Sequence, residues 1–66
     1  MNITVNGKLE TVEPDTAIAD FLKIKRLDPE KVVVEHNQEI VERENLGSVM
    51  LMENDSLEVL RFVGGG

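Results

Sequence analysis

Residues 2–12 read NITVNGKLETV and contain two short alternating runs on either side of Asn6-Gly7. Asn and Gly tolerate a positive φ, so this dipeptide between alternating runs is the strongest short-range signal for a β-hairpin. The stretch therefore predicts two antiparallel strands joined by a tight turn. We expect Ile3, Val5 and Leu9 to share the buried face of this hairpin.

One amphipathic helix is predicted to follow the hairpin, at about residues 17–25. Pro14 and Asp15 interrupt the strand pattern, and Thr16 is placed to cap a helix. Three apolar residues then recur at the i, i+3, i+4 spacing of a buried helix face: Ile18, Phe21 and Leu22. This spacing predicts that the helix packs one face against the strands.

The second half of the chain predicts more strands. VVVEH (32–36) and EIV (39–41) indicate a second hairpin that turns at Asn37-Gln38. SVMLM (48–52) is consistent with a short strand, and LEVLRFV (57–63) indicates the last one. The order β-β-α-β-β-(β)-β favours a single sheet with the helix on one face and the other face open to solvent.

Composition excludes several classes of function. The 66 residues allow one domain, and without cysteine and with His36 as the single histidine we expect no bound metal or cofactor. A formal net charge of −6 argues against a nucleic-acid partner. No run approaches the roughly 20 apolar residues that cross a bilayer, so we expect no membrane partner and a cytoplasmic location.

No constellation of residues predicts catalysis. The glutamates are scattered, no serine, histidine and acid form a triad, and no phosphate-binding glycine loop precedes a helix. Asp55 lies in a predicted turn without a calcium-binding loop pattern, so we expect it to hold that turn. The protein is predicted to be a substrate and carrier, not an enzyme.

The whole chain resembles a known family. ITVNGK, DTAIADFL, VVEHNQEIV, ENDSLEVLRFV and the terminal GGG are together similar to the ThiS family of thiamine-biosynthesis sulfur carriers, which have the ubiquitin-like β-grasp fold. The resemblance implies an α+β fold with a mixed four- to five-stranded sheet and one helix on one face. It also implies a β-grasp domain at residues 1–63 and a flexible glycine tail at 64–66. Many members end in two glycines, whereas this chain has three.

Glycines at a chain end suit a carboxylate that must enter another protein's active site. Glycine has no Cβ, so Gly64, Gly65 and Gly66 can pass through a narrow channel and approach a nucleotide closely. A carboxylate is a poor electrophile until it is linked to AMP, after which sulfur can attack it. Three extended residues reach only about 10 Å, so the folded domain must dock against the enzyme. The alternative is that these glycines are a frayed end or a cloning remnant.

The resemblance implies a complete sulfur-transfer route. An E1-like (ThiF-like) adenylating enzyme uses ATP to activate the Gly66 carboxylate, and a cysteine desulfurase or other persulfide donor converts it to a thiocarboxylate. A ThiG-like thiazole synthase then takes the sulfur. Two other functions stay open: a carrier similar to the small subunit of molybdopterin synthase, and a noncatalytic β-grasp interaction module such as a TGS-like domain.

Residue parity in the last strand predicts a docking patch. Leu57 and Val59 lie on one side of the strand, and Leu60 and Phe62 lie with Glu58 on the solvent side. By the same rule Val33 points outward, so Val33, Leu60 and Phe62 form the candidate patch. Phe62 folding over the edge of the core, or a register shifted by one residue, is the alternative. Arg61 could meet a partner carboxylate or simply be solvated.

Overall fold

Two β-hairpins form the outer strands of the sheet, one on each side of its central strand, and both have the turns that the sequence predicts. The computed structural model describes residues 1–62 of the chain. β1 (Asn2–Val5) and β2 (Lys8–Thr11) are joined by Asn6 and Gly7, with φ of 50° and 83°. β3 (Val32–His36) and β4 (Glu39–Val41) are joined by Asn37 and Gln38, with φ of 51° and 74°. Two consecutive left-handed residues give a turn whose twist matches that of the flanking strands.

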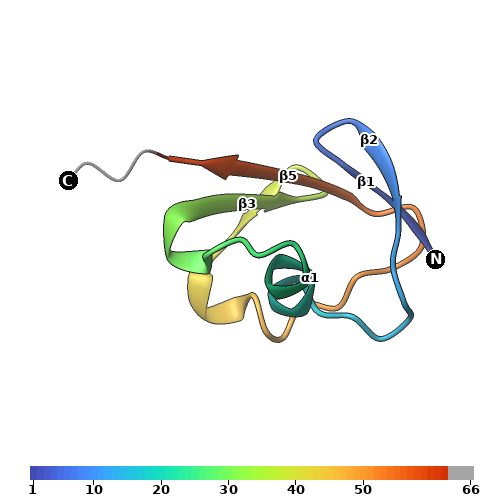
Figure 1. Cartoon of the computed structure of the whole chain (residues 1–66), viewed down its shortest axis with the longest axis horizontal. Coiled ribbons are helices and arrows are strands. Elements are labelled where there is room, and N and C mark those ends of the chain that lie inside the picture. Colours follow the sequence, from blue (N-terminus) through green and yellow to red (C-terminus); the bar gives the residue numbers. More distant parts are fainter. Residues whose placement is uncertain (63–66) are drawn as a thin grey trace.

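The sheet has the order β2-β1-β5-β3-β4 and contains both parallel and antiparallel pairs. β5 (Ser56–Arg61) lies at its centre, parallel to β1 and antiparallel to β3. α1 (Ile18–Ile24) covers one face of the sheet, as Figure 1 shows, and two short 3₁₀ helices (Pro29–Lys31 and Arg43–Asn45) lie in the connections. This architecture confirms the α+β fold with a mixed five-stranded sheet.

The core lies between α1 and the sheet. Six large side chains there are essentially inaccessible to solvent: Ile3, Ile18, Phe21, Leu22, Val34 and Leu57. The helix contributes half of them, at the spacing seen in the sequence, so its predicted buried face is confirmed. Such dense apolar packing stabilises a small domain that has no cysteine with which to form a disulfide.

The prediction that Leu9 lies on the buried face is wrong. The two-residue turn pairs Val5 with Lys8, and the register that follows pairs Ile3 with Glu10 and Thr4 with Leu9. Residues directly opposite each other share a face of the sheet, so Leu9 lies with Thr4 on the open face. Its side chain is 73% exposed.

The start of the helix also differs from the prediction. Ala17 occupies the N-cap position, and its N–H donates to the Asp20 carboxylate at 3.3 Å. Thr16 is buried and its hydroxyl donates to the Glu13 carbonyl at 2.7 Å. Thr16 therefore stabilises the turn before the helix and does not cap it.

Residues 48–52 do not form a strand of the sheet. They make one isolated bridge, from Met50 to Ala17, and Leu51 N–H donates to the Thr16 carbonyl. This segment therefore bonds to the residues just before α1 and not to a strand of the sheet. Leu51 is buried in the core.

No helix within residues 1–62 is long and apolar enough to cross a membrane. The predicted flexible tail at 64–66 and the predicted domain end at residue 63 lie outside the described residues.

Candidate functional site

The side chains of β5 alternate as the sequence predicts. Leu57 and Val59 are buried against α1, whereas Leu60 is 55% and Phe62 is 44% exposed. Glu58, between Leu57 and Val59 in the sequence, is exposed on the open face. The register of the last strand is therefore confirmed, and the alternative of a one-residue slip is excluded.

The three residues of the predicted docking patch come together. Val33 and Leu60 are directly opposite each other in the β3–β5 ladder, and Val33 is 37% exposed. The Phe62 N–H donates to the Lys31 carbonyl at 3.1 Å, which holds Phe62 beside the start of β3. Val33, Leu60 and Phe62 thus form an apolar patch next to the end of the described chain. Its role in docking stays a prediction.

The apolar surface is larger than predicted. Ile40, on β4, is 64% exposed and lines a hollow of about 380 Å³ together with Val33 and Phe62. Ile40 pairs with Glu35, so it lies on the open face. The alternation in EIV could have indicated this, because Val41 packs against the core and its neighbour must then point outward.

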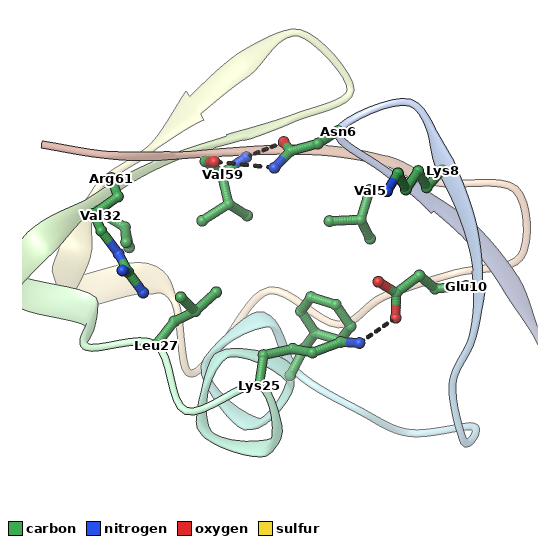
Figure 2. Close-up of a pocket in the computed structure, with 10 residues that line it drawn as sticks. Val5, Asn6, Lys8, Glu10, Lys25, Leu27, Val32, Val59 and Arg61 are labelled. Atoms are coloured by element: carbon green, nitrogen blue, oxygen red, sulfur yellow. Dashed lines mark hydrogen bonds and ion pairs between the residues drawn. The ribbon is translucent and has the colours of Figure 1, made fainter.

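Asn6 fixes the middle of β5, a contact that the sequence did not indicate. Its side-chain Oδ1 accepts from the Val59 N–H at 2.8 Å, and its Nδ2 donates to the Val59 carbonyl at 3.2 Å (Figure 2). The Asn6 N–H also donates to the Leu57 carbonyl. β1 has already turned away at this point, so the side-chain amide of Asn6 makes the two hydrogen bonds to Val59 that the backbone of a longer β1 would make.

The residue before β5 is fixed by a polar cluster. Asp55 is buried and its carboxylate accepts from the Met52 N–H at 2.8 Å and from Asn37 Nδ2 at 3.1 Å. His36 Nε2 lies 2.7 Å from the same carboxylate. Burial by itself raises the pKa of Asp55, but these hydrogen bonds outweigh it and hold the pKa below its usual value. Asp55 holds its turn, as predicted.

The glycines of the predicted site, Gly64, Gly65 and Gly66, lie outside the described residues. The structure describes the strand that precedes them. The first residues of β5 pair with both β1 and β3, and Leu57 is buried in the core. Exposed apolar side chains, Leu60 and Phe62, lie at the end of β5 and directly after it. This arrangement is that of a β-grasp protein with an accessible surface at the end of its central strand.

Comparison with known proteins identifies the family. The model of the ThiS family matches residues 3–66, and the chain belongs to this family. The sulfur carrier protein ThiS of Bacillus subtilis is 38% identical over 65 residues, which are 97% of this chain and 98% of the relative. These matches confirm the predicted resemblance to the ThiS family of sulfur carriers.

A solved structure and a longer relative extend the comparison. The crystal structure of the thiamine biosynthesis protein ThiS from Geobacter metallireducens superposes with a TM-score of 0.86, at 38% identity over all of both chains. A thiazole synthase of Magnetococcus marinus is 41% identical over all 66 residues. The chain spans only 20% of that relative's length.

Proposed function

We propose that this protein carries sulfur as a thiocarboxylate on Gly66 and donates it to a thiazole synthase in thiamine biosynthesis. The observation that carries the proposal is the family match, which runs through residue 66 and includes the glycines. The accessible patch of Val33, Leu60 and Phe62 supports it, because a short glycine tail can enter an active site only if the domain docks nearby.

The proposed chemistry has three steps on Gly66. A carboxylate oxygen attacks the α-phosphorus of ATP in an E1-like (ThiF-like) enzyme, which gives the acyl adenylate and pyrophosphate. The terminal sulfur of a persulfide, from a cysteine desulfurase or another donor, attacks the carbonyl carbon and displaces AMP. A second thiol then attacks the resulting acyl disulfide, which leaves the thiocarboxylate and a disulfide between that thiol and the donor. These steps take place in the cytoplasm and need no cofactor bound to the carrier.

Thiazole synthase is proposed as the acceptor because of its similarity to this chain. The thiazole synthases of Magnetococcus marinus and Paramagnetospirillum magneticum each contain a stretch similar to all 66 residues. A carrier-like stretch and a thiazole synthase within one polypeptide favour direct transfer between them.

The experiment follows the mass of the carrier. With an adenylating enzyme, ATP and a persulfide donor, the protein should gain the mass of one oxygen-to-sulfur exchange, located on Gly66 by fragmentation. A variant extended beyond Gly66 has no carboxylate there and should gain nothing. Equal exchange in the extended variant, or none in the wild type with an enzyme shown to bind it, would support the noncatalytic interaction module instead.

A further inference from the structure

The central strand has an open backbone edge beside Arg61. β1 pairs with β5 only as far as Leu57, whereas β5 continues to Arg61. Backbone groups of successive strand residues point to opposite edges. Leu57 and Val59 direct theirs toward β1 and Asn6, so those of Arg61 point the same way. Phe62 bonds to Lys31 across the β3–β5 ladder, so the neighbouring pair of Arg61 and Val32 is a non-hydrogen-bonded one. The Arg61 N–H and carbonyl oxygen therefore point away from β3, and within residues 1–62 no loop or side-chain hydrogen bond reaches them.

This edge borders a hollow of about 420 Å³ between the sheet and the end of α1. Val32 lies directly opposite Arg61, so both side chains are on the helix side of the sheet. Figure 2 shows Arg61 beside Val32 at one end of the hollow and Lys8 at the other. Apolar walls come from five residues: Val5, Phe21, Leu27, Val32 and Val59.

The hollow is basic although the protein is acidic. Three of the chain's seven lysines and arginines line it, Lys8, Lys25 and Arg61, against one acid, Glu10. Glu10 already pairs with Lys25 at 2.6 Å. In the described part of the chain neither Lys8 nor Arg61 forms an ion pair, so the hollow keeps an excess of positive charge. A carboxylate is the complementary group.

We propose that this edge binds an extended segment of the activating enzyme, which pairs with the Arg61 backbone and places an aspartate or glutamate against the Arg61 guanidinium. The inference rests on the proposed function and adds its docking chemistry. Arg61 lies between Leu60 and Phe62, so one partner can cover the apolar patch on the open face and bond to the edge of the same strand. Added strands gain affinity from main-chain hydrogen bonds and specificity from alternate side chains.

The first test measures adenylation as ATP–pyrophosphate exchange, with an E1-like enzyme that activates the wild-type protein. Arg61→Glu should raise the KM for the carrier about tenfold with kcat unchanged, because an opposed charge replaces a charge-assisted hydrogen bond. Lys23→Glu is the matched control, since it makes the same charge change on α1 away from the hollow, and its KM should stay at the wild-type value. Equal KM values for the two variants would overturn the proposal.

The second test measures hydrogen exchange of the Arg61 amide by NMR, with the carrier free and bound to that enzyme. In the free protein Arg61 should exchange faster than Phe62, whose N–H has a partner, and in the complex it should slow about tenfold or more. No slowing in the complex would overturn strand pairing. Exchange of the Arg61 amide is also measured without the enzyme, at high carrier concentration and with ATP. If either condition alone slows the exchange, the edge binds a second carrier molecule or ATP, and the proposal is overturned.

If no adenylating enzyme exchanges pyrophosphate with the wild type, the proposed function fails and this inference fails with it. If exchange occurs and Arg61→Glu behaves as Lys23→Glu, only the inference fails.

Discussion

The two halves of β5 have opposite environments. The first half lies between β1 and β3, has Leu57 buried, and is preceded by Asp55 in its polar cluster. The second half keeps β3 on one side only and exposes Leu60, and Phe62 directly after the strand is exposed as well. The same strand therefore anchors the chain at its start and presents a surface at its end. The comparison indicates that substitutions up to and including Val59 should impair folding, whereas those after Val59 should impair docking.

The largest effect is expected at Val59. An aspartate at this buried position loses the apolar packing of Val59 and has its charge largely withdrawn from water, which costs about 4 kcal/mol, close to the whole stability of a domain of this size. Val59→Asp should unfold the protein, whereas Leu60→Asp, on the open face, should leave the free energy of unfolding within about 1 kcal/mol of the wild type. Urea denaturation followed by circular dichroism measures both. Equal destabilisation would mean that the two halves do not differ as described.

Asp55 should give the next largest effect. Asp55→Ala leaves the Met52 N–H and the Asn37 amide without their acceptor, so we expect a loss of about 2–3 kcal/mol in the free energy of unfolding. Asn45→Ala, an exposed side chain in the second 3₁₀ helix, is the control and should change little. A loss as small as that of the control would show that the cluster does not anchor β5.

The contribution of Asp55 should depend on pH. Its pKa is lower in the folded protein than the ordinary value of 3.8, so folding favours the ionised form. The stabilisation is therefore complete above pH 3.8 and is lost as the pH falls through the folded pKa. The difference in unfolding free energy between wild type and Asp55→Asn should shrink on acidification below that pH. A constant difference would contradict this assignment.

Asn6 should give a smaller effect at the boundary between the halves. Asn6→Gly keeps the positive φ but removes both side-chain hydrogen bonds to Val59, so we expect a loss of about 1–2 kcal/mol. Hydrogen exchange should show the loss at Val59, whose N–H becomes unpaired. If the Val59 amide in Asn6→Gly exchanges as slowly as in the wild type, the Asn6 side chain does not extend the pairing of β1 with β5.

Local signals in the sequence predicted most of the fold. Asn6-Gly7 and Asn37-Gln38 marked both turns, and the spacing of Ile18, Phe21 and Leu22 marked the helix. Leu9 was misplaced because a two-residue turn pairs odd with even positions, so the face of a residue on the second strand depends on the register and not on alternation alone.

The site was predicted only in part. Parity placed Val33 and Leu60 on the open face, and the register brings them side by side. The bonds from Asn6 to Val59 and from His36 to Asp55 join residues far apart in the chain, and no local pattern encodes them. The open edge at Arg61 depends on where β1 stops relative to β5, which is a property of the assembled sheet.

The most direct measurement is adenylation of Leu60→Asp, because this substitution changes the docking patch and leaves the buried half of β5 intact. With an enzyme that activates the wild type, its KM should rise about tenfold or more while its free energy of unfolding stays near the wild-type value. Leu9→Asp, on the open face but on the edge strand β2, is the matched control and should keep the wild-type KM. An unchanged KM for Leu60→Asp would contradict the assignment of the end of β5 as the surface that docks.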